Sequence, residues 1–583
     1  MYACAPSIPS RGRPSRAKTR PSLLRSMLSF SGGTLVSRVL GLVREQASAW
    51  AFGANAMTDA FWVAFRIPNF LRRLFAEGSF SVAFVPVLTQ TKETRPPAEL
   101  RELVARVSGT LGALLLLVTA AGVLGAPWLA AAFAPGSIDD PYKYGLTSDL
   151  LRVTFPFLLF VSLTALAGGV LNSFHQFMLP ALTPVILNLC MIAAALWGRQ
   201  FFDVPIMALG WAILAAGVLQ LLLQLPALAR LGLLVWPRWG WRHEGVRRVL
   251  RLMLPTLFGS SVAQVNLLLD TLIASFLVAG SQTWLAQTDR LLEFPLGVFG
   301  VALGTVILPS LSRHHVGTDR AAFARALDWG LRTALLIAVP AMLALVLLAG
   351  PILATLLQYG RFTAHDVDMA ALSLSALALG LPAFVLVKVL APAFYARQDT
   401  ATPVRAGVAA MCANMLLNLL FVALLFWLWH EPADLAEGWL AGIARVPGLH
   451  MGLALASALA SYLNLALLWR ALRREGVYQR QPGWGRHLLR LALACVAMVL
   501  VLLLARWYWP VWGEWGALAR VWRLGAVIAA AAGTFVLVLL AAGLRLRDLR
   551  ASRAGRRGAP CAHPAAAIAA AQRLYSRDEP AVS

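Results

Sequence analysis

Residues 103–133 have the sequence LVARVSGTLGALLLLVTAAGVLGAPWLAAAF, in which Arg106 is the single charged residue. A helix needs about 20 apolar residues to cross the roughly 30 Å hydrocarbon core of a bilayer, so this stretch is long enough to span a membrane. The whole chain of 583 residues has the same character, with 59% hydrophobic residues, 13% charged residues and a mean hydropathy of +0.69. Soluble domains carry roughly 25% charged residues. The composition therefore excludes a large soluble enzyme and indicates a membrane protein.

Apolar stretches of spanning length recur from Ser29 to about Leu546, separated by short polar segments. We count about fourteen of them, which predicts an all-α polytopic membrane protein with about fourteen transmembrane helices. The expected spans cover residues 29–52, 58–90, 103–133, 150–174, 181–201, 206–228, 249–278, 283–311, 323–357, 369–395, 403–429, 451–472, 488–509 and 521–544.

The distribution of Lys and Arg predicts the orientation of the chain, because short cytoplasmic loops are enriched in both residues. The N-terminal tail, the loops at 238–248, 313–320 and 470–486, and the C-terminal tail are all rich in Arg. The intervening loops hold acidic residues instead, for example Asp139 and Asp140. We therefore expect both termini in the cytoplasm and an even number of crossings. The net charge of +24 follows this loop pattern, so we do not expect nucleic acid as a partner.

An internal repeat relates the two halves of the chain. Pro86 and Pro309 begin similar short segments, PVLT and PSLS, and lie 223 residues apart, as do Pro180 and Pro403. Chance recurrence of proline is the alternative, but the matches keep their order and spacing. The offset covers about six helices, which predicts two lobes of the same orientation, as in transporters built from parallel repeats. The expected segments are a disordered basic tail (1–22), an N-terminal six-helix lobe (23–230), a C-terminal six-helix lobe (246–474), an additional helix pair (484–546) and an Ala/Arg-rich tail (547–583).

Ionisable residues occur inside the first, second and eighth expected spans. Each such group near the bilayer centre costs on the order of 2.5–3.5 kcal/mol and usually faces a bundle interior or an aqueous cavity. Arginine binds phosphate oxygens through a planar pair of hydrogen bonds, so several arginines in one cavity favour a phosphorylated or diphosphate substrate. The alternative is that they neutralise nearby carboxylates or extend to the membrane interface. The polar residues concerned are Arg38, Arg44, Glu45, Asp59, Arg66, Asn69, Arg72, Arg73, Glu77, Asp289, Arg290 and Glu293.

A second polar set consists of Asp270, in the seventh expected span, with Asn414 and Asn418, one helical turn apart in the eleventh. Carboxylate and amide oxygens bind hard cations, so this set is our candidate site for a monovalent coupling ion such as sodium. The alternative is interhelical hydrogen bonding, worth about 0.6 kcal/mol per bond. The chain has no GxxxxGK[ST] phosphate-binding loop and no Ser/His/Asp constellation, so we expect neither an enzyme nor a further cofactor.

Four segments of the sequence resemble those of a known family. They are SRVLGLVRE at 37–45, TDAFWVAFRIPNFLRRLFAEG at 58–78, DRLLEFP at 289–295 and KVLAPAFYARQD at 388–399. From about Leu23 to Leu546 the chain is similar to the MurJ (MviN) lipid II flippases of bacterial peptidoglycan synthesis. The resemblance implies the fold of the multidrug/oligosaccharidyl-lipid/polysaccharide exporter superfamily. In the family, two six-helix lobes form a V, and two extra C-terminal helices form a groove for a polyprenyl tail.

The resemblance also implies an activity and a location. The family moves lipid II, the undecaprenyl-diphosphate-linked disaccharide pentapeptide, from the inner to the outer leaflet of the bacterial inner membrane. By motif, Arg38, Arg44 and Arg290 resemble the family's essential cavity arginines, which implies that they hold the diphosphate. The further substrate positions that the resemblance implies are Asp59, Asn69, Arg72, Glu293 and Thr283, the last of which stands where many members have Ser.

Two alternatives belong to other classes of protein: a cation-coupled drug or metabolite antiporter of the same superfamily, and a membrane scaffold without transport activity. A drug antiporter should have an aromatic and acidic cavity, and a scaffold has no reason to bury so many charges. The partners we expect are lipid II, membrane lipids and other cell-wall synthesis proteins. Transport would be driven by a cation gradient or by the membrane potential, worth about 2.3 kcal/mol per charge per 100 mV.

Overall fold

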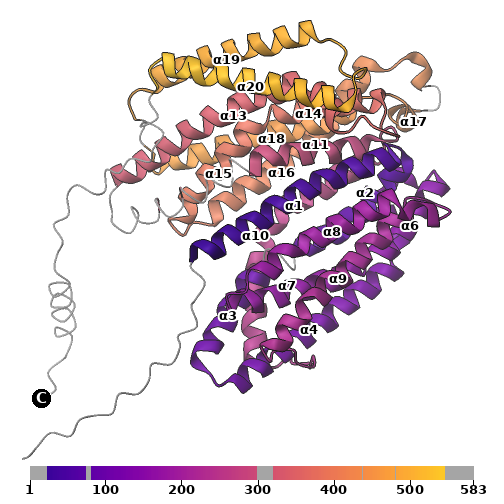
Figure 1. Cartoon of the computed structure of the whole chain (residues 1–583), viewed down its shortest axis with the longest axis vertical. Helices are drawn as coiled ribbons and strands as arrows, with labels where there is room; N and C mark the ends of the chain where they lie inside the picture. The colour runs from indigo at the N-terminus through magenta and orange to yellow at the C-terminus, as the bar shows by residue number, and fades with distance from the viewer. Residues whose placement is uncertain are drawn as a thin grey trace, which may run out of the picture.

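All regular secondary structure in the described part of the chain is helical. The computed structural model describes residues 23–73, 80–297, 307, 311, 320–435, 438–478 and 481–544. Both predicted tails, 1–22 and 547–583, lie outside these ranges, and so does Glu77. The regular elements within the ranges are α-helices and short 3-10 helices, which confirms the predicted all-α fold (Figure 1).

The first nine helices pack into one bundle, the N-terminal lobe. Their buried side chains form one hydrophobic cluster that starts at Ala47 and also takes in residues of the following helix, such as Val246 and Met253. The helices are α1 (Leu23–Phe52), α2 (Ala56–Arg72), α3 (Phe80–Thr94), α4 (Pro97–Leu124), α5 (Ala126–Phe133), α6 (Pro141–Thr154), α7 (Phe157–Ser173), α8 (Met178–Leu196) and α9 (Met207–Arg230).

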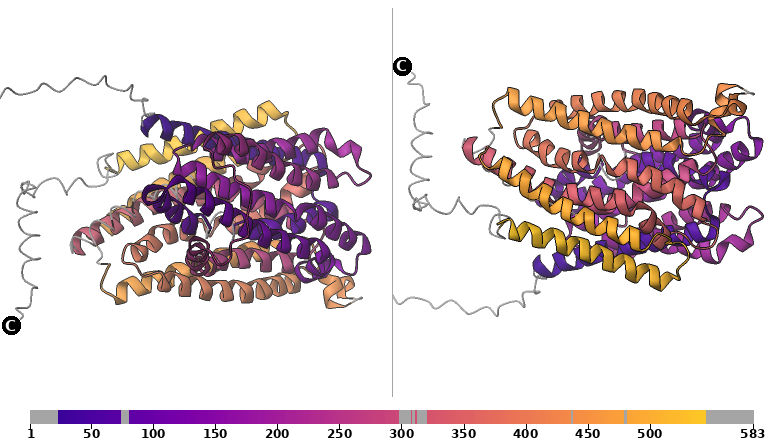
Figure 2. Two further views of the ribbon diagram at one scale, coloured as in Figure 1. Left: turned by 90° about the horizontal axis from the view of Figure 1, so that it is seen from below. Right: turned by 90° about the horizontal axis from the view of Figure 1, so that it is seen from above.

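The helices that follow form the C-terminal lobe, with a second hydrophobic cluster that runs from Ile273 to Tyr478. Figure 2 shows that the long helices of both lobes run roughly along one common direction, as helices that cross a membrane together must. The helices of this lobe are α10 (Glu244–Ala274), α11 (Ser281–Pro295), α13 (Arg320–Leu356), α14 (Ala364–Ala378), α15 (Leu381–Tyr395), α16 (Ala401–Trp429), the short α17 (Trp439–Ile443) and α18 (His450–Arg474).

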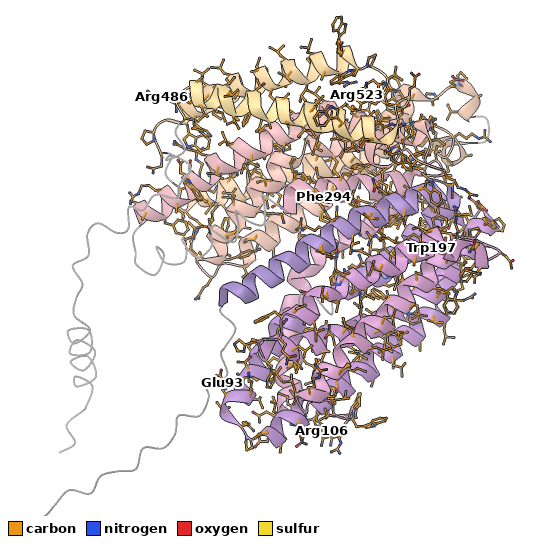
Figure 3. All side chains as sticks on the ribbon, in the orientation of Figure 1. Glu93, Arg106, Trp197, Phe294, Arg486 and Arg523 are labelled. Atoms are coloured by element: carbon orange, nitrogen blue, oxygen red, sulfur yellow. The ribbon has the colours of Figure 1, made fainter. Side chains whose placement is uncertain are left out.

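The last two helices, α19 (Trp484–Tyr508) and α20 (Ala517–Ala541), form a hairpin on the outside of the C-terminal lobe. Arg486 and Arg523, near the start of each helix, lie at opposite ends of the hairpin (Figure 3). Both helices pack on α13, and their apolar side chains join those of α13 and α14 in a third buried cluster. The hairpin therefore packs against the lobe mainly through α13 and does not lie between helices of the lobe.

The two lobes repeat the same packing scheme, which agrees with the predicted duplication. In the N-terminal lobe α1 packs on α8, α2 on α6, α7 on α9 and α8 on α9. The same pairings recur in the C-terminal lobe, where α10 packs on α16, α11 on α14, α15 on α18 and α16 on α18. Six helices of the first lobe, α1, α2, α6, α7, α8 and α9, thus have counterparts with corresponding neighbours among the described helices of the second.

Polar side chains fix where two of these helices begin. Asn55 precedes α2 and accepts hydrogen bonds from the backbone N–H groups of Met57 and Thr58, while the Thr58 hydroxyl accepts from the Asn55 N–H. Thr363 and Asp366 form the same reciprocal arrangement at the start of α14. Such a capping box satisfies N–H groups that have no partner within the helix. Both caps lie at the end of the molecule where the lobes meet.

The predicted number of membrane crossings is not confirmed. Among the described residues, nine helices are long and apolar enough to cross a membrane, or ten if the bent pair of α14 and α15 forms one span. α2 and α11 do not qualify, because they have 17 and 15 residues and carry many polar side chains. A helix surrounded by lipid needs about 20 apolar residues to cross a bilayer. A helix that faces a polar cavity can carry polar side chains on that face, so it does not need a fully apolar sequence.

The lobes touch at the end of the molecule where α1 ends and α2 begins. The backbone N–H of Arg361 donates to the carbonyl oxygen of Trp50 at 3.0 Å, and the Gly136 N–H donates to the Ser275 hydroxyl at 3.1 Å. Gly360 has a φ of +60°, and a Cβ atom there would lie 2.4 Å from the Trp50 carbonyl oxygen. Glycine is required at this position because only a residue without a side chain allows this backbone geometry and this close approach.

Candidate functional site

A large cavity lies between the two lobes and has two connected parts. The first, which we call the amide cavity, has a volume of about 720 Å³ and extends into the C-terminal lobe beside α16 and α18. The second, the arginine cavity, has a volume of about 640 Å³ and lies beside α1, α2, α8 and α11. Pockets that bind small molecules typically have volumes of roughly 300–1,000 Å³. The two parts share the lining residues Phe65, Asn69, Arg73, Arg290, Glu293, Leu296 and Lys388.

The arginine cavity brings together most of the residues predicted to bind substrate. α1 places two basic side chains in it, α2 places an amide and a basic side chain, and α11 places a basic and an acidic one. Phe294, also in its lining, lies at the centre of the molecule between the helices of the two lobes (Figure 3). The predicted residues that line this cavity are Arg38, Arg44, Asn69, Arg72, Arg290 and Glu293.

Glu45 joins two of these arginines across the lobes. It forms an ion pair with Arg44, and its Oε1 lies 3.6 Å from Nε of Arg290 on α11. Gln287 donates to its Oε2 at 3.4 Å, and Arg44 donates to Oδ1 of Asn188 on α8 at 3.1 Å. Arg44 and Glu45 are only 8% and 5% exposed. A buried charge needs such partners, so Glu45 neutralises and positions both guanidinium groups.

The third predicted diphosphate ligand, Arg38, is exposed and lies closer to the start of α1. A Cβ atom at Gly297 would be 2.7 Å from its Nη1, so the guanidinium group lies directly against the C-terminal lobe. Arg290 also donates to Oε2 of Glu293 at 3.3 Å. Three arginines from two lobes therefore reach one cavity, and the partially exposed groups, Arg38 and Arg290, keep donors available for a bound anion.

α2 contributes a row of polar side chains that faces the second lobe. Arg72 donates from Nε to Oδ1 of Asn69 at 2.9 Å. Arg66, which is 8% exposed, donates to the Thr271 hydroxyl on α10 at 2.7 Å, and its Nη2 lies 3.8 Å from Oδ2 of Asp289 on α11. Because both contacts of Arg66 cross from one lobe to the other, this residue holds the walls of the cavity in their present positions.

Asp59 and Thr283 do not line either part of the cavity. Both are buried, and they join the lobes where α2 and α11 begin. Asp59 accepts hydrogen bonds from the Thr283 N–H at 3.0 Å, the Thr283 hydroxyl at 2.8 Å and the Gly280 N–H at 2.7 Å. The first N–H groups of a helix lack internal partners, so Asp59 of the N-terminal lobe caps α11 of the C-terminal lobe. Their predicted contact with substrate stays a prediction, and the contacts that the structure shows for them are between the lobes.

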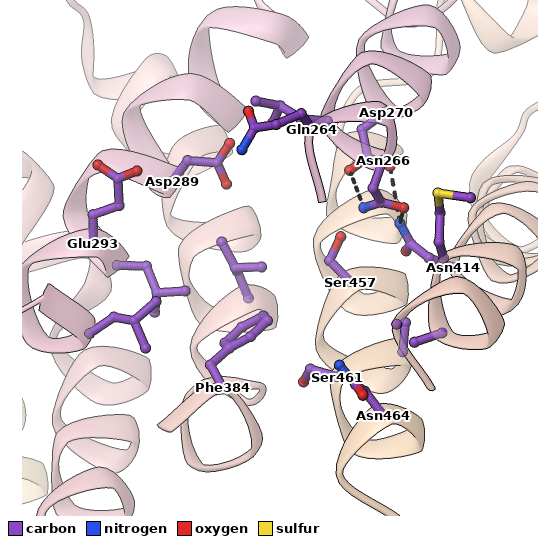
Figure 4. Close-up of a pocket in the computed structure, with 18 of the residues that line it drawn as sticks. Gln264, Asn266, Asp270, Asp289, Glu293, Phe384, Asn414, Ser457, Ser461 and Asn464 are labelled. Atoms are coloured by element: carbon purple, nitrogen blue, oxygen red, sulfur yellow. Dashed lines mark hydrogen bonds between the residues drawn. The ribbon is translucent and has the colours of Figure 1, made fainter. Parts of the chain in front are cut away.

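The predicted cation set is assembled in one place. Asn418 and Asn414 donate from Nδ2 to Oδ1 of Asp270 at 2.6 and 3.3 Å, and Asn414 also donates to Oδ1 of Asn266 at 2.8 Å. The Oδ1 atoms of Asn414 and Asn418 are buried and have no hydrogen-bond partner in the described part of the chain. These contacts, drawn in part in Figure 4, are the interhelical hydrogen bonds of the alternative interpretation, and the binding of a monovalent cation by the same oxygens stays a prediction.

Sequence reasoning missed several residues of the site. Glu45, Arg66 and Asp289 were visible as ionisable residues within apolar stretches, but their roles depend on partners in the other lobe. Asn188 and Lys388 also line the arginine cavity, and each is a single polar residue that no periodic pattern marks. Only the packing of α8 on α1, and of the lobes on each other, brings them to the site.

Two repeated helical lobes around a polar cavity are the architecture of an alternating-access membrane transporter. The fold is similar to that of a multidrug resistance MATE family transporter of the MOP superfamily in an inward-facing conformation, with a TM-score of 0.58 and 12% identity, covering 78% of this chain and 98% of that one. It is also similar to a structure described as lipid II flippase MurJ in an inward closed conformation, with a TM-score of 0.69 and 24% identity, covering 88% and 98% of the two chains.

Sequence comparisons identify the family within this class. The family model for the lipid II flippase MurJ matches residues 48–429. The chain is 44% identical over 539 residues to a probable lipid II flippase MurJ of Vibrio cholerae, covering 91% of this chain and 98% of the relative. It is 43% identical over 481 residues to the lipid II flippase MurJ of Burkholderia cenocepacia, covering 82% and 89%. The chain belongs to the MurJ family.

Proposed function

We propose that this protein moves lipid II from the inner to the outer leaflet of a bacterial inner membrane by alternating access. The observation that carries the proposal is the arginine cavity between the lobes, in a chain that belongs to the MurJ family. Arg38, Arg44 and Arg290 would hold the diphosphate, because guanidinium groups bind phosphate oxygens through paired, charge-assisted hydrogen bonds. Glu45 orients two of them and prevents their mutual repulsion from opening the site.

The state of the structure fits the loading step of such a cycle. With the termini in the cytoplasm, as the distribution of arginine predicts, the contacts of Asp59 with α11 and of Trp50 with Arg361 lie at the outer end of the bundle. These contacts separate the cavity from the outside. Transport then requires the lobes to part at this end and to meet at the other.

The coupling ion and the path of the lipid tail are parts of the same proposal. A sodium ion held by Asp270, Asn414 and Asn418 would connect α10 to α16 within the C-terminal lobe, and its release would alter the packing of both helices. The membrane potential is the alternative driving force. The polyprenyl tail would stay in lipid or in a groove along α19 and α20, whose outer faces carry many exposed apolar side chains.

The charge of the cavity distinguishes this function from drug or metabolite antiport. Seven basic side chains line the described walls of the two parts, compared with four acidic ones. A cationic drug would be repelled by this excess, whereas a diphosphate would be attracted. The basic residues are Arg38, Arg44, Arg66, Arg72, Arg73, Arg290 and Lys388, and the acidic residues are Glu45, Asp270, Asp289 and Glu293.

Complementation of a bacterium depleted of its own flippase tests the proposal. We expect the full chain to restore growth and to restore exposure of lipid II on the outer face of spheroplasts, as measured by external labelling of its headgroup. Failure of a well-expressed, membrane-inserted chain to restore either property would overturn the proposal. Resistance to cationic drugs, without lipid II export, would favour the antiporter instead.

A further inference from the structure

We infer that the segment that joins the two lobes, residues 231–243, is an anchor at the cytoplasmic interface of the bilayer, where its tryptophans contact phospholipid. We call it the interlobe segment. It connects α9 to α10 and forms neither a helix nor a strand. None of the expected membrane spans includes it, because it is short and interrupted by proline and arginine. The inference concerns a contact with the membrane and goes beyond the proposed transport of lipid II.

The interlobe segment exposes three tryptophans. Trp236, Trp239 and Trp241 are 85%, 61% and 50% exposed. The rings of Trp239 and Trp241 are stacked, with centroids 6.3 Å apart and planes inclined by 12°, so they form one apolar face. Trp is enriched at both membrane–water interfaces, because its apolar ring meets the acyl chains while its N–H group reaches the headgroups. The segment therefore has the surface of an interfacial anchor.

Hydrogen bonds to α4 hold the interlobe segment in one place. The backbone N–H of Arg238 donates to the carbonyl oxygen of Ala105 at 2.8 Å, and the Gly240 N–H donates to the Thr110 hydroxyl at 3.1 Å. A Cβ atom at Gly109 would lie 2.3 Å from the Arg238 carbonyl oxygen, so the segment is seated against α4 where that helix has no side chain. The position of the tryptophans is therefore set by α4.

α4 also gives the depth at which the segment lies. Arg106, the last charged residue of this helix, donates from Nη1 to the Trp239 carbonyl oxygen at 3.0 Å. Residues 107–124 of α4 carry no charge and extend over about 27 Å, close to the roughly 30 Å of the hydrocarbon core. The hydrocarbon therefore begins near Val107, and the tryptophans lie at its edge. An irregular backbone cannot lie deeper, because its N–H and C=O groups would lack partners in lipid.

The segment passes along the perimeter of the molecule. Figure 3 shows Arg106 at the edge of the N-terminal lobe that faces away from the C-terminal lobe. Lipid surrounds the bundle at this edge. The position favours the bilayer over a cytoplasmic protein as the partner, because a protein would have to displace lipid to reach the tryptophans.

Basic residues on and beside the segment match the phosphate groups of the bilayer surface. Between residues 230 and 251 the chain has six arginines, all exposed, and one acidic residue, Glu244. Guanidinium groups bind phosphate oxygens through paired hydrogen bonds, and basic clusters next to a membrane span bind lipid headgroups. The arginines are Arg230, Arg238, Arg242, Arg247, Arg248 and Arg251.

Fluorescence quenching by spin-labelled phospholipid tests this inference. The full chain, with its five native cysteines replaced, carries Trp239→Cys labelled with bimane, whose rings take the place of the indole, and is placed in phospholipid nanodiscs. The quenchers are phosphatidylcholine with a nitroxide near the glycerol end of one acyl chain, and iodide in the water. As a matched control, Ala98→Cys puts the probe on an exposed residue of α4 that lies about 13 Å before Val107 along the helix.

We expect the lipid nitroxide to quench the probe of Trp239→Cys several-fold more strongly than that of Ala98→Cys, and iodide to show the reverse order. Thermal melting of the labelled protein checks that each variant is folded. Trp236→Cys gives a second site, with the same expected order, if the first variant does not fold.

Two outcomes would overturn the inference. Strong quenching of the segment by iodide and weak quenching by the lipid nitroxide, in folded protein, would place the tryptophans in water. Weak quenching by both would show that protein covers the segment, as in an assembly of two copies of this chain. The measurement does not involve lipid II, so its result is separate from that of the complementation test.

Discussion

At the scale of single residues, the main feature of this protein is that its functional charges are shared between lobes. Glu45 of α1 contacts Arg290 of α11, and Asp59 of α2 caps α11. In each case a carboxylate of one lobe satisfies donors of the other. The same side chains can therefore contribute to ligand binding or to the relative position of the lobes, and substitutions can separate these roles.

Arg44 tests whether charge or geometry matters in the arginine cavity. Arg44→Lys keeps the positive charge beside Glu45 but cannot form the paired hydrogen bonds of a guanidinium group. We expect this variant to reach the membrane at normal levels and to lose most of its ability to restore growth to a flippase-depleted strain. Arg44→Ala should be inactive, and it should also be less stable because Glu45 loses its closest partner, a change worth about 3–5 kcal/mol for a buried ion pair.

The double substitution Arg44→Ala/Glu45→Ala distinguishes the two roles of this arginine. If Arg44 binds substrate, removal of Glu45 restores membrane expression but not growth. Growth of the double variant would instead show that Arg44 only neutralises Glu45, because removing both charges would then remove the defect. Expression and growth are measured on the same cells.

Asp59 tests the closure of the outer end. Asp59→Ala removes the acceptor of three hydrogen bonds from the start of α11, so we expect the lobes to separate more readily at this end. A cysteine at Asn69, in a chain without its native cysteines, reports the change. Its labelling by an impermeant maleimide added outside the cell should be several-fold faster in the Asp59→Ala background. Unchanged labelling would mean that other contacts close this end.

At the scale of helices, the attachment of α19 and α20 depends on a few buried polar contacts. Arg520 of α20 is 7% exposed and donates to the carbonyl oxygens of Trp515 at 2.7 Å and of Ala354, in the last turn of α13, at 2.8 Å. It also donates to the carbonyl of Gln358 at 3.2 Å. A positive charge at the C-terminal end of α13 interacts favourably with the helix dipole. The hairpin is therefore anchored to the lobe at one end through this residue.

Arg520→Met should loosen this anchor while retaining most of the apolar volume of the side chain. Several carbonyl groups lose their donor, so we expect the free energy of unfolding to fall by about 2 kcal/mol or more and proteolysis in the α19–α20 hairpin to become faster. Arg506→Met is the matched control, because Arg506 is on α19 and donates one long hydrogen bond, of 3.3 Å, to the Leu347 carbonyl. Equal stability of the two variants would contradict the anchoring role.

At the scale of the whole molecule, two duplicated lobes meet where α2 and α11 begin and along α10, and they enclose a cavity that both of them line. Alternating access requires that the lobes can close the cavity at one end or at the other, and two lobes around one cavity allow this. The hydrophobic clusters of the two lobes are largely separate, but α10 contributes Val246 and Met253 to the cluster of the N-terminal lobe, so a relative movement of the lobes must involve α10.

The distribution of basic residues predicts on which side of the membrane the two termini lie. The basic composition of both tails and of alternate loops predicts that both termini lie in the cytoplasm. We expect a reporter fused after residue 22, and another fused after Arg557, to show cytoplasmic activity. An external signal from either fusion would reverse the assignment of the closed end as the outer one, and the loading step would then have to be reassigned to the other leaflet.

Local features of the sequence were enough to predict the class of structure and the charged part of the site. Apolar content along a stretch is a local property, so the helices and the membrane environment followed from hydropathy, and the repeat followed from the spacing of prolines. A charge within an apolar stretch is costly unless it faces a cavity, which marked a set of polar residues, and the resemblance to the family singled out Arg38, Arg44 and Arg290 among them. Hydropathy did not determine the number of crossings. α2 and α11 face the polar region between the lobes, so they are too polar to be recognised as apolar spans.

Only the tertiary structure decided which charges are partners. Glu45 and Gln287 are 242 positions apart, and Asp59 and Thr283 are 224 positions apart, yet each pair forms hydrogen bonds. Asp59 and Thr283, predicted substrate residues, lie outside the cavity lining and join the lobes, and Asn188 lines the cavity without any signal in the sequence. The physical reason is that a helix presents several faces, and the packing of the two lobes alone determines which face meets the cavity.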